Sequence, residues 1–286
     1  MPQSRRPFPV IVGVPRSGTT LLRLLLDAHP QMVIPPETPW LGKVAQSLRT
    51  HPADLEGVRQ AFQSGRGNNL RIPDSDLDAI FAAHDPAAPA ETVRRIYDHY
   101  RCRHAAPRVG DKTPAHLMVM DEIAAIMPEA HFIHIIRDGR DVAVSLRPLW
   151  FGPGQDMAAA GRFWAERIRN ARQQALGLPH YLEVRYEALV QSPETVLRKI
   201  AGFIDLPFDP VQLRAYETAE DRIGEFQSHN HNGLLVTSEM LKGIHALTSS
   251  PPDPSRVGRW MDQLSAEDKA AFEATAADML SELGYC

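Results

Sequence analysis

An apolar run near the amino terminus leads through a short turn directly into a leucine-rich stretch, and this pairing constrains the fold more than any other feature. Residues 8–14 read Phe-Pro-Val-Ile-Val-Gly-Val, which is typical of a buried β-strand. The turn at residues 15–18 (Pro-Arg-Ser-Gly) follows, and residues 19–29 predict a buried helix that ends before a proline. Because this order directs backbone N–H groups and a helix N-terminus at one point, it predicts an anion site in an α/β fold.

The alternation of strand and helix recurs along the chain. Residues 131–137 and 180–184 predict two further buried strands. Helical patterns cover residues 157–176 and 193–204. Strands that alternate with helices indicate a parallel sheet flanked by helices. We therefore expect residues 1–286 to form a single α/β domain with a P-loop-like nucleotide site.

Two segments are less regular. Residues 40–108 are rich in proline, glycine and charge, and we interpret them as helices and loops that form an acceptor-side wall. Residues 222–255 are predicted to be a long loop. Because long loops in compact domains are often covers over binding sites, we expect this one to be lid-like.

The composition restricts the classes of partner and compartment. A net charge of −4 over 286 residues gives no global signature for nucleic-acid binding. The two cysteines, Cys102 and Cys286, fit a reducing cytosol and exclude a disulfide framework. His229 and His231 lack a third ligand nearby, so we expect no metal site. With no apolar run long enough for a membrane span, we expect a cytoplasmic protein that binds neither nucleic acid nor membrane.

The turn after the first strand is similar to a phosphate-binding loop but lacks one of its parts. Gly13 and Gly18 have the spacing of a P-loop, whereas Thr19 stands where the P-loop lysine is found. An enzyme of nucleoside triphosphates needs this lysine and an acid that holds magnesium. A nucleotide-dependent kinase is therefore the second interpretation. Pro15 breaks the Gly-x-Ser-x-Gly pattern that a serine hydrolase needs around Ser17.

Four blocks of sequence, in family order, resemble the sulfotransferases that use 3′-phosphoadenosine 5′-phosphosulfate (PAPS). Residues 12–30 (VGVPRSGTTLLRLLLDAHP) resemble the 5′-phosphosulfate loop in the form that tyrosylprotein sulfotransferases and their bacterial relatives carry. Residues 132–145 (FIHIIRDGRDVAVS) resemble the 3′-phosphate motif. Residues 184–190 (VRYEALV) resemble the Tyr-Glu segment, and residues 256–260 (RVGRW) resemble the end of the loop that covers the cofactor.

The resemblance implies a role for each matching residue. The residues of the loop that would cradle the 5′-phosphosulfate are Arg16, Ser17, Gly18, Thr19 and Thr20. Arg137 and Ser145 would bind the 3′-phosphate, with Tyr186 assisting. Glu37 falls 21 residues after Arg16, where the tyrosylprotein enzymes carry their glutamate base. Lys112 falls where that family places a lysine near the transferring group.

Sulfuryl transfer is an in-line displacement that relies on positioning and charge stabilisation. Glu37 suits the base, and partial burial would raise its pKa toward neutrality. Arg16, Lys112 and the loop amides suit stabilisation of the developing charge, and the low charge of a sulfuryl group leads us to expect no metal. Plainer interpretations stay open: Glu37 as a helix-start acid, Lys112 paired with Asp111 at the surface, and Arg137 paired with a nearby aspartate.

The acceptor class is less constrained. Pro39 stands where the tyrosylprotein pattern has an arginine associated with acidic peptides. Basic and acidic residues nearly balance in the expected wall, residues 40–108. We therefore expect a hydroxylated small metabolite or a carbohydrate as the acceptor, and peptidyl tyrosine is the alternative. A nucleotide-binding module without turnover is a more distant one.

Overall fold

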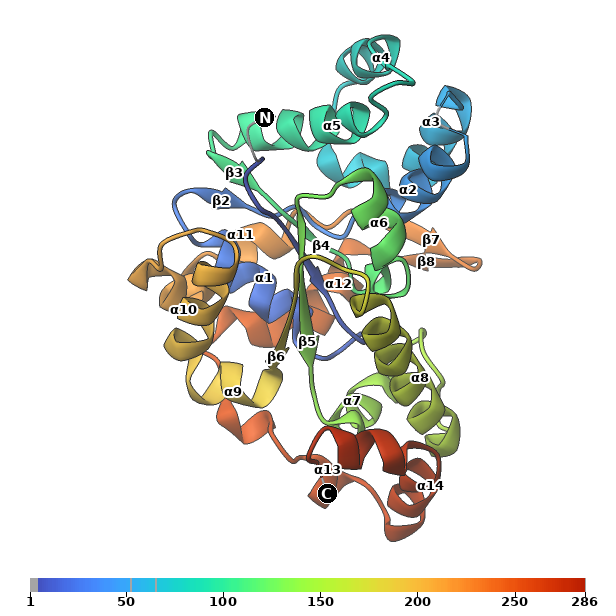
Figure 1. The fold of residues 1–286 in the computed structure, drawn as a ribbon. Coiled ribbons are helices and arrows are strands. Elements are labelled where there is room, and N and C mark those ends of the chain that lie inside the picture. Colours follow the sequence, from blue (N-terminus) through green and yellow to red (C-terminus); the bar gives the residue numbers. More distant parts are fainter. Residues whose placement is uncertain (1–4, 52, 65, 286) are drawn as a thin grey trace.

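A four-stranded parallel sheet forms the centre of the molecule (Figure 1). The computed structural model describes residues 5–51, 53–64 and 66–285. In the sheet order β4-β1-β5-β6, the strands are β4 (Asp111–Lys112), β1 (Phe8–Val12), β5 (Ala130–Ile136) and β6 (Tyr181–Arg185). The predicted α/β fold with a central parallel sheet is confirmed.

The strands of this sheet were predictable to different degrees. The three apolar strands predicted from the sequence all exist, with ends that differ by one or two residues. The short edge strand β4 was not predicted, because its two residues, Asp111 and Lys112, are both charged. Both are nevertheless fully buried in the structure. Burying two charged groups on a sheet edge costs free energy unless they are paired, so β4 is a place to look for function.

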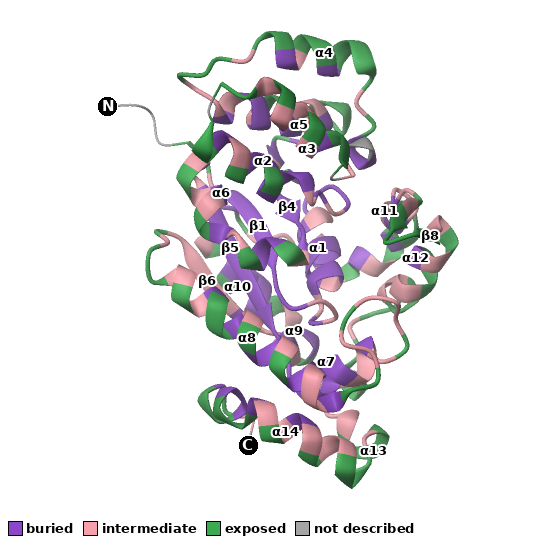
Figure 2. Ribbon diagram, turned by 90° about the vertical axis from the view of Figure 1, so that its right-hand side faces the viewer, coloured by how far each residue is buried: buried purple, intermediate pink, exposed green. Residues whose placement is uncertain are grey.

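The central strands β1 and β5 contribute side chains to two separate cores, because successive side chains point to opposite faces. Val10 and Val12 pack on one face and Ile11 on the other. The helices that contribute to the first core are α2 (Trp40–Thr50), α3 (Leu55–Ser64), α4 (Asp74–Ala82), α5 (Ala90–Arg103), α6 (Met120–Ile126), α7 (Gly139–Leu146), α8 (Met157–Ala175) and α14 (Ala266–Glu282). Those of the second core are α1 (Thr19–Asp27), α9 (Tyr186–Gln191), α10 (Pro193–Phe203), α11 (Ala219–Ile223) and α12 (Ser238–His245). Figure 2 shows the buried strands between these helical layers.

The segment from residue 40 to 108 is mainly helical, as expected, and comprises α2 to α5 with a short strand at its end. That strand, β3 (Arg108–Val109), pairs in parallel with β2 (Met32–Val33). Arg66 is the one residue of the segment that lines the large cavity described below, as far as the described residues go. Most of the segment therefore packs away from that cavity.

The segment from residue 222 to 255 is not the irregular loop that the sequence analysis predicts. It contains an antiparallel hairpin of β7 (His229–His231) and β8 (Leu234–Val236), followed by α12 and a 3-10 helix. The turn of the hairpin is Asn232-Gly233, and both residues have positive φ, 50° and 86°. Asn-Gly is a strong hairpin signal because it tolerates this left-handed backbone, so the sequence did contain the information.

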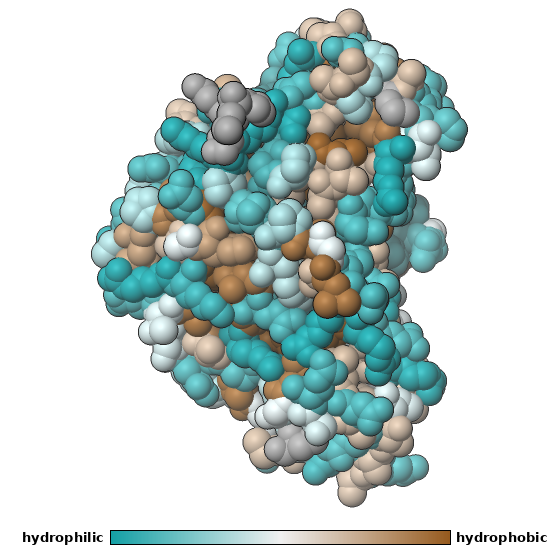
Figure 3. Space-filling view, in the orientation of Figure 1, coloured by the Kyte–Doolittle hydropathy of each residue, from teal (hydrophilic) through white to brown (hydrophobic). Residues whose placement is uncertain are grey.

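Apolar side chains on the face shown in Figure 3 gather in small patches between hydrophilic ones. The helix α13 (Trp260–Gln263) follows the segment that resembles the end of the cofactor-covering loop. Within the described residues, none of the helices has the length and apolar character needed to cross a membrane.

Candidate active site

The turn between β1 and α1 has positive φ at two positions. Arg16 has φ of 73° and Gly18 has φ of 97°, and both values lie in the left-handed region. Gly18 is also the N-cap residue of α1 and supplies no side-chain cap. The first N–H groups of the helix lack intrahelical partners, so they are available to an anion at this end.

Tyr186 forms the floor beneath this loop. A methyl group added at Gly18 would lie 2.5 Å from Cδ2 of Tyr186, so only glycine fits there. The guanidinium carbon of Arg137 lies 4.3 Å from the centre of the same ring, on which it rests as a cation–π contact. Tyr186 therefore holds both the loop and Arg137, which is a positioning role at the predicted donor site.

Three arginines converge at the carboxyl ends of β1 and β5. Arg16 donates from Nε to Oγ of Ser145 at 3.3 Å, and Arg137 donates to the backbone oxygen of Arg16 at 3.3 Å. Burial and the neighbouring cations of Arg137 and Arg256 lower the pKa of Arg16 to about 10. Mutual repulsion of this kind is relieved by a bound anion, so the cluster fits a phosphate or sulfate ester.

The segment that contains Arg256 is fixed by an aspartate of α7. Asp141 accepts hydrogen bonds from the backbone N–H groups of Gly258 at 2.9 Å and Trp260 at 3.0 Å. Arg137 donates to the backbone oxygen of Arg256 at 2.6 Å and lies 3.4 Å from Oδ2 of Asp141. The aspartate pairing considered for Arg137 therefore exists, and it holds the arginine at the cavity.

Glu37 and Lys112 form an ion pair at the other end of the loop. Nζ of Lys112 lies 3.0 Å from Oε1 of Glu37 and 3.4 Å from Oγ1 of Thr20. Arg66 approaches the other carboxylate oxygen of Glu37 at 3.4 Å. The interpretation that Lys112 pairs with Asp111 at the surface is wrong, because Lys112 is fully buried and its ion-pair partner is Glu37.

The prediction that burial raises the pKa of Glu37 is also wrong. Burial on its own would raise this pKa, but the cations of Lys112 and Arg66 outweigh burial and hold it at about 2. Burial lowers the pKa of Lys112, and Glu37 partly opposes this effect. Glu37 is therefore an ionised carboxylate in this structure, and its basicity is suppressed by its partners.

A buried polar network holds the backbone that carries Glu37. Thr38 donates from its backbone N–H to Oγ1 of Thr113 at 2.8 Å, and its hydroxyl donates to Asp111. Tyr97 donates to Oδ2 of the same carboxylate at 2.8 Å. Asp111 thus fixes residue 38 from β4 while the next residue, Lys112, contacts Glu37. This arrangement accounts for the two buried charges on the edge strand.

These groups surround a cavity of about 540 Å³. The predicted site residues that line it are Arg16, Gly18, Thr19, Thr20, Glu37, Arg137, Ser145 and Tyr186. Ser17 and Lys112 are buried and are not among the residues that line it. Oγ of Ser17 and Nε of Arg137 are buried without a hydrogen-bond partner in the described structure. An unpaired buried donor is costly, and Arg137 lines the cavity, so its Nε is consistent with a polar ligand there.

Several cavity residues were not among the predicted site residues. Arg256 belongs to a block that resembles the family, which is a signal that could have placed it in the site. Phe226, His229 and His245 come from the segment interpreted as an irregular loop. Arg66 has no sequence signal that distinguishes it from other arginines in its segment. Among the described residues, no group of three potential ligands could hold a metal ion.

Comparisons with known proteins agree with this geometry. A model of the sulfotransferase family matches residues 7–210. The nodulation protein NoeE of Sinorhizobium fredii is 29% identical, and the alignment covers 98% of this chain and 67% of NoeE. A protein-tyrosine sulfotransferase of Drosophila melanogaster is 28% identical, with 98% of this chain and 52% of the fly enzyme covered. The chain thus spans half to two thirds of the length of these two relatives.

A solved structure shows that the likeness extends to the fold. The sulfotransferase domain from the curacin biosynthetic pathway matches with a TM-score of 0.61 at 21% identity, over 98% of this chain and 99% of that domain. The match to the family model covers most of the chain and includes the first three of the four sequence blocks, together with the arginine-lined loop. The chain belongs to the sulfotransferase family.

Proposed function

We propose that the chain transfers the sulfuryl group of PAPS to a hydroxyl group of an acceptor. The observation that carries this proposal is the convergence of Arg16, Arg137 and Arg256 on one cavity beside the β1–α1 loop. A nucleotide with phosphate groups at both ends needs cations at two positions, and these arginines lie along the cavity wall. Membership of the family supports the same donor.

The residues present fit the two ends of the donor. The loop from Arg16 to Thr20 would hold the 5′-phosphosulfate through the backbone N–H groups at the start of α1. Arg137, Ser145 and Arg256 would hold the 3′-phosphate. Charge-assisted hydrogen bonds of this kind are the strong ones, so they select a bisphosphorylated nucleotide.

Glu37 is the proposed base, and Lys112 controls it. The carboxylate lines the cavity and is ionised, but its ion pair with Lys112 makes it a weak base. Lys112 also reaches Oγ1 of Thr20 on the loop. A negative charge on the loop would draw Lys112 toward it, weaken the pair, and raise the pKa of Glu37. Lys112 and Arg16 would then stabilise charge on the departing phosphate.

A neutral hydroxyl compound, either a small metabolite or a carbohydrate, is the favoured acceptor. Arg66 is the one arginine of segment 40–108 that lines the cavity among the described residues, and it is paired with Glu37. An acidic peptide would find little uncompensated positive charge there. Peptidyl tyrosine stays the alternative, because the fly relative is a protein-tyrosine sulfotransferase.

Thermal unfolding against a nucleotide panel tests the proposal. Adenosine 3′,5′-bisphosphate (PAP) at 100 times its Kd should stabilise the protein by about 2.7 kcal/mol. ATP with magnesium should stabilise it far less. Stabilisation by ATP with magnesium but not by PAP would favour the kinase interpretation. Binding of PAP without transfer to any acceptor would favour a non-catalytic module. The cytoplasmic location stays a prediction.

A further inference from the structure

His245 lies on the cavity wall in a position that the proposed mechanism does not use. It is the last residue of α12, and it lines the same cavity as Glu37 and Arg16. Burial, together with the cations of Lys112 and Arg16, lowers its pKa to about 3, while Glu37 opposes this shift. These charges place the imidazole in the electrostatic field of the proposed reaction centre, and they keep it neutral at neutral pH.

The ring of His245 is held in place by an aromatic neighbour. It stacks on Phe226 with ring centres 5.3 Å apart and planes 20° from parallel. The ammonium nitrogen of Lys112 lies 5.4 Å from the centre of the same Phe226 ring. One side of the imidazole is therefore covered, and Phe226 links it to the lysine that pairs with Glu37.

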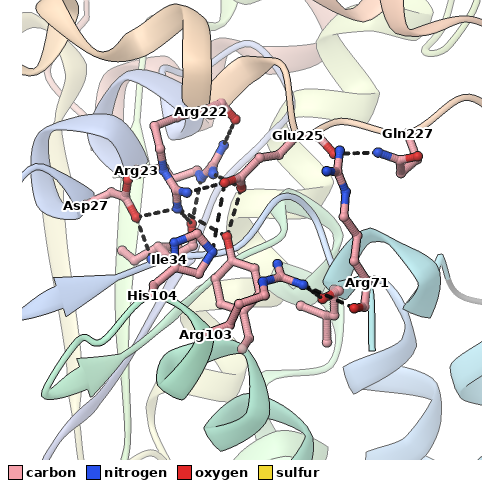
Figure 4. Close-up of polar contacts among 11 residues, drawn as sticks. Arg23, Asp27, Ile34, Arg71, Arg103, His104, Arg222, Glu225 and Gln227 are labelled. Carbon is pink, nitrogen blue, oxygen red and sulfur yellow. Dashed lines mark hydrogen bonds and ion pairs between the residues drawn. The ribbon is translucent and has the colours of Figure 1, made fainter. Parts of the chain in front are cut away.

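Charged side chains cluster around Glu225, the residue before Phe226 (Figure 4). The preceding residue, Glu225, accepts a hydrogen bond from Tyr100 at 2.8 Å and forms ion pairs with Arg23 and Arg222. Arg222 also pairs with Asp27 of α1 at 2.6 Å. The cluster joins α1, α5 and the end of α11, so the segment that carries Phe226 is anchored to the body of the protein.

The backbone next to His245 is tied to the phosphate loop. Arg16 donates from Nη2 to the backbone oxygen of Ile244 at 3.2 Å. The hydroxyl of Thr248 donates to the backbone oxygen of His245 at 2.7 Å. The imidazole is thus fixed relative to the loop that would hold the donor, rather than carried on a freely moving segment.

The ring nitrogens of His245 are available to a ligand. Among the described residues, none forms a hydrogen bond with either ring nitrogen. The neutral imidazole has one donor and one acceptor, so it can bind a hydroxyl group in either sense. An ordered, neutral side chain with unused hydrogen-bonding groups, beside a proposed base, is suited to orient an uncharged substrate.

We infer that His245 binds the acceptor and orients its hydroxyl toward the sulfuryl group, and that the acceptor is a neutral alcohol or phenol. This inference rests on the proposed sulfuryl transfer. It assigns no proton transfer to His245: the imidazole donates or accepts one hydrogen bond with the acceptor, and Glu37 takes the proton. The segment from Phe226 to His245 then contributes to acceptor choice as well as covering the cavity.

Two substitutions separate hydrogen bonding from packing. His245→Phe keeps an aromatic ring against Phe226 but removes both ring nitrogens, whereas His245→Gln keeps a polar terminus. His180→Phe is a matched control outside the cavity, where the ring of His180 stacks on His131 with centres 3.8 Å apart. For each protein, the Kd for PAP is measured by calorimetry. The kcat and KM are measured with 2-naphthol, methyl β-D-glucopyranoside and an acidic tyrosine peptide.

Substitution of His245 should impair the reaction with the acceptor without weakening the binding of PAP. His245→Phe should lower kcat/KM for 2-naphthol or the glucoside by about tenfold, because one hydrogen bond is lost, and should change the Kd for PAP less than about twofold. His245→Gln should recover part of the loss, and His180→Phe should match the wild type. Unchanged kinetics in His245→Phe, an equal loss of PAP binding, or a preference of the wild type for the peptide would overturn it. A wild type that binds no PAP and sulfates none of the three would remove the proposed function itself.

Discussion

The ammonium nitrogen of Lys112 lies 3.0 Å from Oε1 of Glu37, and of this ion pair Glu37 lines the cavity. Lys112 comes from the edge strand β4, and Glu37 lies between β2 and α2. The pair joins the group proposed to take a proton to the group proposed to stabilise the leaving phosphate. A donor that draws Lys112 to the loop would therefore also activate the base.

Replacing Glu37 tests its assignment as the base. Glu37→Gln should lower the rate of the chemical step by roughly 10²- to 10⁴-fold, the usual contribution of a general base. The Kd for PAP should stay the same or fall, because Lys112 loses its acidic partner and becomes available to an anion. Single-turnover rates with labelled PAPS give the first quantity and calorimetry gives the second. A variant that reacts at the wild-type rate would remove Glu37 from the mechanism.

Arg137 should determine the preference for a 3′-phosphate. Its Nε is buried without a partner, and the guanidinium rests on Tyr186 at the cavity wall. Arg137→Ala should weaken PAP binding by about ten- to 100-fold, since a charged hydrogen bond contributes about 1.5–3 kcal/mol. Binding of adenosine 5′-phosphosulfate, which lacks the 3′-phosphate, should change far less. Equal losses for both ligands in calorimetric titrations would show that Arg137 has no such selectivity.

Gly18 should tolerate no side chain. Gly18→Ala would place a methyl group 2.5 Å from Tyr186 at a residue with φ of 97°, so it should destabilise the fold by about 1–3 kcal/mol and weaken PAP binding. Gly202→Ala is the matched control, because Gly202 lies in α10 with no atom near the added methyl group. It should stabilise the fold by about 0.5–1 kcal/mol. Urea unfolding of both variants tests the contrast, and similar effects would contradict it.

His134 should make the protein less stable in mild acid. It is fully buried on β5, and burial lowers its pKa to about 4, against an ordinary value of 6.5. The unfolded chain therefore binds this proton first as the pH falls. Above pH 6.5, His134 is neutral in both the folded and the unfolded state and does not reduce the free energy of unfolding. As the pH falls from 6.5 to about 4, this free energy should decrease by up to about 3 kcal/mol.

Denaturant unfolding of His134→Gln checks this effect. The variant removes the titrating group, so its free energy of unfolding should fall less between pH 7 and 5 than that of the wild type. The readout is the difference in slope with pH rather than the stability itself, because the substitution also changes packing. Parallel slopes in the two proteins would contradict the assignment to His134.

The parts of the site that follow long apolar strands were predictable from the sequence. Arg16 follows β1 and Arg137 follows β5, and the carboxyl ends of adjacent parallel strands meet at one edge of a sheet. Strand identity and sheet order therefore bring these two arginines together. An alternating or continuous apolar pattern in the sequence is enough to identify the strands that these arginines follow.

Other parts depend on contacts between distant segments, which no local pattern encodes. The low pKa of Glu37 arises from Lys112 and Arg66, which are 75 and 29 residues away in the chain. Sequence reasoning considered burial alone and therefore predicted the wrong direction. The place of His245 depends on its stacking on Phe226, which a reading of the segment as an irregular loop could not anticipate. The pKa of Glu37 and the position of His245 therefore depend on long-range electrostatics and packing.

Transfer of a labelled sulfuryl group from PAPS to an acceptor is the direct test of the proposed reaction. The chelator-treated protein is incubated with excess EDTA, labelled PAPS and the panel of 2-naphthol, glucoside and tyrosine peptide, and both the sulfated product and PAP are measured. Equal amounts of PAP and of sulfated 2-naphthol or glucoside are expected, because the arginines and Lys112 supply the positive charge that the reaction needs. Activity that appears only with ATP and magnesium, or no sulfated product at any PAPS concentration, would contradict it.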